Sequence, residues 1–255
     1  MKYEQLEKYL DEDLGWRKVE ISDLLFLAKT TNNSEVILKS LILLLYAHWE
    51  GYIKKSSKLY IKYISEEKVK LNDLSYNFKA VALKEHVSKC IDTKDKLTLA
   101  NELTFVSSFL KFENKKFKID VNIDNNFDSG IIDTESNLKP KVFKNIIEIL
   151  GLNYKNALEA REHYINSHLL ANRNAIGHGN KFDPNTQLDF SLTIKDVEKL
   201  KTIVFSIIDN FKEELLEYIY SKYYLETNQA KKIELENKKE IELEKLFASI
   251  EESFA

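Results

Sequence analysis

The chain has 255 residues, of which 44% are hydrophobic and 31% are charged, and its formal net charge is −3 at pH 7. The composition is that of a globular protein, and the length allows one large domain with a sizeable core. The slight negative charge excludes the broad basic field of a protein that holds DNA or RNA tightly. The single cysteine, Cys90, excludes an internal disulfide and a cysteine-built metal site, so we expect a reducing, cytoplasmic location.

Two prolines and six glycines in the whole chain favour long helices. Residues 2–30 carry regularly spaced leucines and predict one helix, or two helices separated near Gly15. The same periodicity, with capping residues, predicts further helices over residues 35–65, 76–90, 94–112, 140–150, 156–176, 193–224 and 226–255. We therefore divide the chain into an N-terminal helical segment (1–33), a helical bundle (34–224) and a charged C-terminal helix (225–255).

The helix over residues 35–65 is expected at the centre of the bundle. Its middle, from Leu41 to Tyr46, is apolar all round and must be buried on more than one side. The longest apolar run, Leu41 to Ala47, is far shorter than the ~20 residues that cross a bilayer, so we expect no membrane segment.

Two stretches depart from the bundle pattern. Residues 117–123 alternate apolar and polar side chains, so the insertion at about 113–140 is expected to form a small β-hairpin or a loop over one end of the bundle. In the C-terminal helix, a narrow apolar stripe is long enough for docking or a short partner contact, and it comprises Leu243, Phe247, Ile250 and Phe254. A polar loop is expected over residues 180–192.

Two lysine clusters are either solvated faces or contacts for nucleic acid. They comprise Lys54, Lys55, Lys58 and Lys62, and Lys111, Lys115, Lys116 and Lys118.

The least ordinary stretch is Arg173-Asn174-Ala175-Ile176-Gly177-His178-Gly179, because the chain contains only three arginines. An arginine and a histidine suit phosphodiester chemistry, since the histidine can exchange a proton near neutral pH and the guanidinium neutralises charge growing on the phosphate. On an unbroken helix the two side chains would lie about 140° apart. We expect Gly177 to end the helix in the left-handed conformation, so that His178 can turn back toward Arg173. Alternatively, both cations simply complement a helix C-terminus.

Glu50 is a candidate supporting residue that would accept hydrogen bonds from Arg173 or orient the His178 imidazole. Alternatively, it is a surface carboxylate paired with Lys54 one helical turn away. His48 is expected to be a core or interface residue. A competing pair, Arg161 and His168, recurs on one helix face but is separated by ~10 Å along the axis, too far to share one phosphate.

Arg173-Asn174-x-x-x-His178-Gly179 resembles the signature of the HEPN superfamily (higher eukaryotes and prokaryotes nucleotide-binding domains), which has an Arg, a polar residue and a His four to six positions beyond. Residues 43–54, Leu-Leu-Leu-Tyr-Ala-His-Trp-Glu-Gly-Tyr-Ile-Lys, resemble a helix of a prokaryotic branch of stand-alone HEPN proteins. Asp133-Thr134-Glu135-Ser136-Asn137-Leu138, running on to residues 150–152, is also similar to that branch. Together these pieces cover residues 35–222.

The resemblance implies an all-α HEPN-like bundle that forms a homodimer, with an endoribonuclease site at the dimer interface that needs no metal or other cofactor. Arg173 and His178 would be catalytic, with Asn174 and Glu50 supporting them. RNA is the implied substrate, and an antitoxin or a restriction or defence protein is a possible partner. The alternative is a non-catalytic helical module that binds a nucleotide or another protein.

Overall fold

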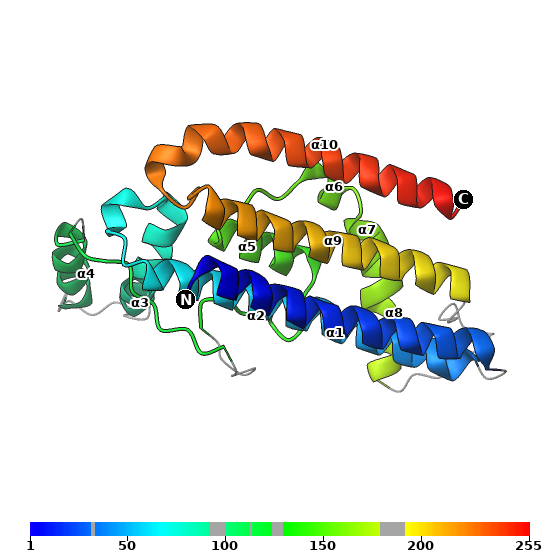
Figure 1. Ribbon diagram of the computed structural model, residues 1–255. Helices are drawn as coiled ribbons and strands as arrows, with labels where there is room; N and C mark the ends of the chain where they lie inside the picture. Colours follow the sequence, from blue (N-terminus) through cyan, green and yellow to red (C-terminus); the bar gives the residue numbers. More distant parts are fainter. Residues whose placement is uncertain (32–33, 92–99, 113, 124–129, 179–191) are drawn as a thin grey trace.

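The computed structural model describes residues 1–31, 34–91, 100–112, 114–123, 130–178 and 192–255, and the regular structure in these ranges is helical. The long helices α1 (Tyr3–Thr30), α2 (Ser34–Glu66), α9 (Ile194–Tyr220) and α10 (Gln229–Ser253) run side by side (Figure 1). Helices α3 (Tyr76–Ile91) and α4 (Ala100–Leu110) lie at one end, whereas α8 (Ala171–Gly177) lies toward the other. Short helices α5 (Pro140–Ile149), α6 (Asn156–Glu159) and α7 (Glu162–Ile165) complete the bundle. The predicted all-α bundle is confirmed.

Helix α1 is a single helix, and its buried leucines, Leu6, Leu10, Leu14 and Leu25, recur on the face that packs against α2 and α9. Gly15 sits inside it with open space where a Cβ would be, so it marks no break and no close approach.

Helix α2 is the core helix that its composition predicts. Leu41, Ile42, Leu45 and Tyr46 are all buried, whereas Leu43 is partly exposed. By length and hydropathy alone the helix matches a membrane span, but half of its most apolar window is buried inside the bundle, as in the core helix of many helical proteins.

The described part of the insertion is a loop, one of the two forms expected, and contains no strand. Phe117 is fully buried and packs edge-on against Phe78 of α3, with ring centroids 5.6 Å apart. Lys116 forms one isolated antiparallel bridge with Lys70, and beyond it the backbone of Ile119 hydrogen-bonds twice with Ser65 Oγ of α2, at 2.8 Å and 3.1 Å. The alternating pattern therefore reflects burial of every second side chain against a helix.

The expected single helix over residues 156–176 is broken. After α6, Arg161 has φ −102° and ψ 0°, which is not helical, and α7 begins after it. Residues Asn166–Leu170 (η2) form a π-helical turn, closed by the hydrogen bond from Ala171 N–H to the Asn166 carbonyl. A π turn holds one more residue than an α turn and so changes the direction of every side chain that follows.

Helix α10 docks on its own chain. Leu243, Phe247 and Ile250 of the predicted apolar stripe are buried. The Glu240 carboxylate accepts hydrogen bonds from the first two backbone N–H groups of α6, at 2.9 Å and 2.8 Å, where a helix attracts negative charge. These contacts fix α10 against the short helices that precede α8.

Candidate functional site

Arg173, on the short helix α8, is the centre of the candidate site. Its side chain is half-buried, and its guanidinium lies over the ring of Tyr46 of α2, with Cζ 4.4 Å from the ring centroid. Nη1 donates a hydrogen bond to Asn174 Oδ1 at 2.8 Å, and Nη2 lies 3.5 Å from the Ser136 carbonyl oxygen. A ring, an amide and a carbonyl therefore orient the guanidinium without neutralising its charge.

Tyr46 connects Arg173 to two other parts of the site. Its hydroxyl accepts a hydrogen bond from Leu138 N–H at 2.9 Å. Burial and the negative charge of the nearby Glu50 raise the pKa of this hydroxyl well above its ordinary value, so it stays protonated. Glu50 thus lies close to the cluster beside Tyr46, and no ion pair between Glu50 and Arg173 is found in the described part of the chain.

The turn before α5 forms one wall of the site. Trp49 Nε1 donates to the Leu138 carbonyl at 3.2 Å, so both backbone polar groups of Leu138 are bound by side chains of α2. Glu135 and Ser136 both have φ of 54°, in the left-handed region that non-glycine residues rarely adopt. Asp133 Oδ1 accepts from Glu135 N–H at 2.8 Å and stabilises this turn. The strained backbone presents the Ser136 carbonyl to Arg173.

His178 lies apart from Arg173. The expectation that Gly177 ends the helix in the left-handed conformation is wrong, because Gly177 is the last residue of α8 and its φ is not positive. His178 is the capping residue, with φ −85°, and its N–H donates to the Asn174 carbonyl at 3.0 Å. The two side chains thus keep the helical separation of about 140° around the axis. The His178 side chain is exposed, while Gly179 and the predicted loop to residue 191 lie outside the described residues.

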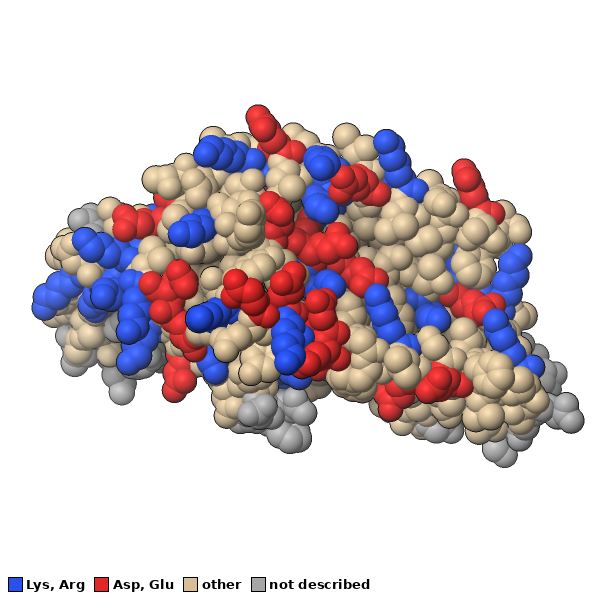
Figure 2. Space-filling model, in the orientation of Figure 1, with Lys and Arg blue, Asp and Glu red and all other residues tan. Residues whose placement is uncertain are grey.

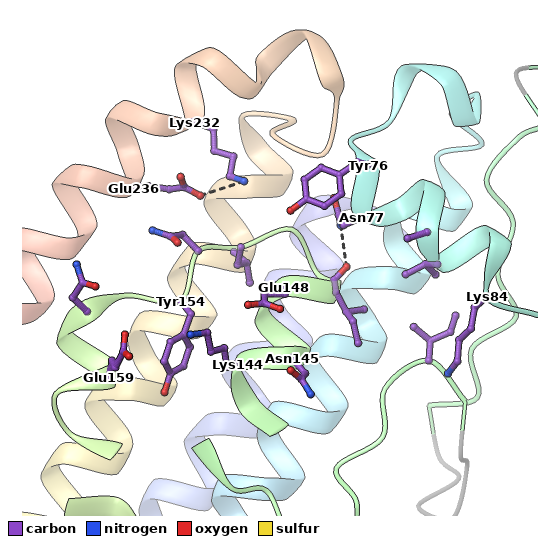
Figure 3. A pocket seen from close by; sticks show the side chains of 17 residues that line it. Tyr76, Asn77, Lys84, Lys144, Asn145, Glu148, Tyr154, Glu159, Lys232 and Glu236 are labelled. Atoms are coloured by element: carbon purple, nitrogen blue, oxygen red, sulfur yellow. Dashed lines mark hydrogen bonds and ion pairs between the residues drawn. The ribbon is translucent and has the colours of Figure 1, made fainter. Parts of the chain in front are cut away.

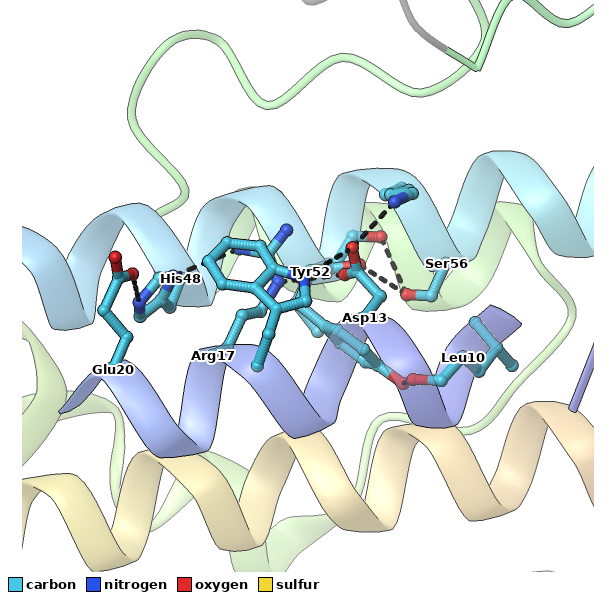
Figure 4. Close-up of polar contacts among 10 residues, drawn as sticks. Leu10, Asp13, Arg17, Glu20, His48, Tyr52 and Ser56 are labelled. Atoms are coloured by element: carbon cyan, nitrogen blue, oxygen red, sulfur yellow. Dashed lines mark hydrogen bonds and ion pairs between the residues drawn. The ribbon is translucent and has the colours of Figure 1, made fainter. Parts of the chain in front are cut away.

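His48 is a core residue, as expected. Its Nδ1 lies 3.2 Å from Arg17 Nη1, and because a guanidinium only donates, this nitrogen is the acceptor and Nε2 carries the hydrogen. Nε2 is 2.9 Å from Glu20 Oε2, in an electrostatic contact that is not a well-directed hydrogen bond (Figure 4). Burial and the neighbouring Arg17 lower the pKa of His48, so it is neutral in the fold.

The same cluster explains Gly51. Arg17 also donates to Asp13 Oδ2 at 2.9 Å, and Lys55 donates to Asp13 Oδ1 at 2.7 Å. A Cβ on Gly51 would lie 3.0 Å from Arg17 Nη1, so the glycine makes room for a side chain of α1.

The competing pair does not form a site. Arg161 Nη2 lies 3.0 Å from Glu244 and 3.2 Å from Glu251 of α10, and its guanidinium lies 4.9 Å from the ring centroid of Phe247. Its charge is therefore used to hold α10. His168 stacks on the ring of Tyr164, at 4.1 Å between centroids, and points to a different set of partners.

The two lysine clusters behave differently. In the first, Lys55 binds Asp13, and Lys58 is buried with its Nζ 2.8 Å from the Asn122 carbonyl, so these two side chains are part of the fold. The four side chains of the second cluster, Lys111, Lys115, Lys116 and Lys118, are exposed. In Figure 2, Lys and Arg side chains gather at the end formed by α3 and α4, the end away from α8.

A separate open groove of ≈ 950 Å³ lies between α3, α5 and the beginning of α10 (Figure 3). Lysines and glutamates are among its lining residues, and Lys232 is paired with Glu236 at 3.2 Å. None of Glu50, Arg173 and His178 lines it. The sequence contains no motif that would have found this groove, because its lining comes from four separate segments.

Comparison with protein families finds a match to a HEPN family model, described as HEPN_MAE_28990-like HEPN, over residues 6–224. No curated protein and no solved structure matches the chain. The matched region runs from α1 through the end of α9 and contains Glu50, Arg173 and His178, while α10 lies beyond it. Since the match covers most of the chain, the protein belongs to the HEPN family.

Proposed function

We propose that this protein is a metal-independent endoribonuclease of the HEPN type. Membership of the family is consistent with a nuclease or RNA-related role. The observation that carries the proposal is the guanidinium of Arg173, which is oriented by Tyr46, Asn174 and Ser136 but has no carboxylate partner among the described residues. A fixed and uncompensated cation suits a site where negative charge develops on a phosphate.

In the proposed reaction, His178 removes the proton from a ribose 2′-hydroxyl, whose oxygen attacks the adjacent phosphorus. The P–O5′ bond breaks, the leaving 5′-oxygen takes up a proton, and the 3′ end of the upstream fragment becomes a 2′,3′-cyclic phosphate. Arg173 stabilises the charge on the phosphate oxygens, and Asn174 holds Arg173. No electron transfer or metal-bound water enters this sequence of steps.

One histidine cannot be base and acid at the same moment. His178 is exposed and directed away from Arg173 of its own chain, so a site within one chain would be incomplete. A two-fold homodimer through the α8 face would supply a second histidine, and isologous pairing of this kind is the commonest symmetry among oligomers. We therefore place the site between two copies.

The biological setting that we propose is that of a cytoplasmic toxin or phage-defence effector, held in check by an antitoxin or a restriction or defence protein. This part of the proposal rests on the resemblance of the motif-bearing segments to stand-alone prokaryotic HEPN proteins. The divergence of Arg173 and His178 within one chain instead favours the second candidate, a non-catalytic module that binds a nucleotide or another protein.

Cleavage of total RNA and tRNA in EDTA distinguishes the two. Wild type is compared with Arg173→Ala and His178→Ala, and His163→Ala is the matched control because His163 is also exposed and lies one helix earlier. Endoribonuclease activity predicts cyclic-phosphate ends in wild type and the control, and their loss in the two site variants. Equal inactivity of all four proteins, together with no relief of growth arrest by either site variant on overexpression, would favour the binding module.

A further inference from the structure

We propose that Tyr46 is a positioning residue, which fixes Arg173 and the turn at residues 133–139 as one rigid unit. The inference rests on the proposed ribonuclease function for its effect on activity, but not for its structural part. Tyr46 belongs to α2 and is separated from Arg173 by about half of the 255 residues, so the link between them exists only in the folded protein.

The ring of Tyr46 orients the guanidinium. Arg173 Cζ lies 4.4 Å from the ring centroid, within the range of a cation–π interaction, and the ring itself is almost completely buried. A buried ring presents a fixed face, since its own rotation is prevented by the surrounding core. The guanidinium therefore lies over a rigid support.

The hydroxyl of Tyr46 orients the turn. It accepts the Leu138 N–H at 2.9 Å, while Ser136, two residues earlier, offers its carbonyl to Arg173 Nη2. One side chain thus contacts the guanidinium through its ring and the wall behind it through its hydroxyl. Glu50 lies near the same hydroxyl, so this supporting carboxylate is close to the cation, and no ion pair between the two is found among the described residues.

The roles of the ring and of the hydroxyl of Tyr46 can be tested separately. Tyr46→Phe keeps the ring and removes the hydroxyl, whereas Tyr46→Leu removes both. Tyr60→Phe is the matched control, because Tyr60 is a buried tyrosine of the same helix whose hydroxyl has no hydrogen-bond partner among the described residues.

The structural readout is the set of arginine Nε–Hε resonances in NMR spectra, of which a chain with three arginines has only three. Arg173→Lys identifies the resonance of Arg173. In Tyr46→Leu this resonance should lose its ring-current shift, while those of Arg17, over Trp16, and Arg161, over Phe247, stay in place and show that the fold is intact. In Tyr46→Phe the shift should remain, and the Leu138 amide should exchange faster with solvent.

The functional readout is the single-turnover rate of RNA cleavage. Misplacement of a catalytic group by about 1 Å reduces the rate roughly 100-fold, so we expect a loss of that order in kcat for Tyr46→Leu, with KM changed less than about threefold. Tyr46→Phe should lose less than Tyr46→Leu, and Tyr60→Phe nothing.

An unshifted Arg173 resonance in Tyr46→Leu would overturn the proposal, as would full activity of this variant where Arg173→Ala is inactive. If Tyr46→Leu does not fold, an unchanged Leu138 exchange rate in Tyr46→Phe would overturn it equally. Inactive wild-type protein would count against the ribonuclease but leave the NMR test of positioning valid.

Discussion

Replacement of Arg17 by methionine should destabilise the bundle strongly. Arg17 and Asp13 are both buried, and the carboxylate of Asp13 receives one hydrogen bond from Arg17 Nε and one from Lys55 Nζ. Methionine fills a similar volume but leaves the Asp13 charge without its buried partner. Breaking one side of a buried ion pair costs about 3–5 kcal/mol, and because Lys55 remains we expect the lower end of that range.

A double variant tests the expected cost of Arg17→Met. Burial tends to raise the pKa of Asp13, but the hydrogen bonds from Arg17 and Lys55 outweigh it and lower this pKa. The double variant Asp13→Asn/Arg17→Met removes both charges, so it should be more stable than the sum of the two single changes predicts. We expect a coupling of about 1–3 kcal/mol, in the range for residues in direct contact.

Urea unfolding at pH 7 measures all four proteins, with circular dichroism for the helices and fluorescence for Trp16, whose ring lies 4.5 Å from the Arg17 guanidinium. A cost below about 1 kcal/mol for Arg17→Met would be that of a surface pair and would refute the reasoning, as would strict additivity of the two changes.

Three further predictions concern single positions. The lowered pKa of His48 means that the unfolded chain takes up a proton first as the pH falls below about 6.5. Wild-type stability should therefore decline from pH 7.5 to 5.5, and an equally steep decline in His48→Gln would contradict this. Gly151→Ala should cost about 1–3 kcal/mol, because φ is 76° and the new Cβ would lie 2.8 Å from an atom of Asn77, whereas Gly15→Ala should not lower Tm in the same thermal scan. Arg161→Lys keeps the charge but loses the fork-like contacts to α10, so amide exchange in residues 229–253 should speed up, and unchanged protection would argue that the apolar stripe alone holds that helix.

The sequence predicted the bundle well because most of its helices have long apolar faces. The boundaries of α1, α2 and α9 lie within a few residues of those expected, and the capping box of Thr193 and Asp196 at the start of α9 is present, with Thr193 N–H 2.8 Å from Asp196 Oδ2. A cap of this kind is a local interaction between residues three apart, so a sequence pattern suffices to find it.

The site was less predictable because its contacts join distant segments. Nothing in the order of residues indicates that the ring of Tyr46 supports Arg173, or that Glu50 lies beside the Tyr46 hydroxyl. Arg161 also illustrates the difficulty. Arg161 and His168 recur on one helix face, and only the position of α10 shows that the charge of Arg161 is already paired with two glutamates.

In the π-helical turn at Asn166–Leu170, the number of residues matters because it sets the direction in which α8 points its side chains. Each residue of an α-helix advances the side-chain direction by about 100°. Deletion of one residue from this turn would allow a regular α-helix to form and would rotate α8 by that angle relative to the helices before it. Arg173 would then leave the ring of Tyr46 even though every residue of the motif was retained. In this part of the protein, an insertion or a deletion therefore changes the direction of the Arg173 side chain more than most substitutions do.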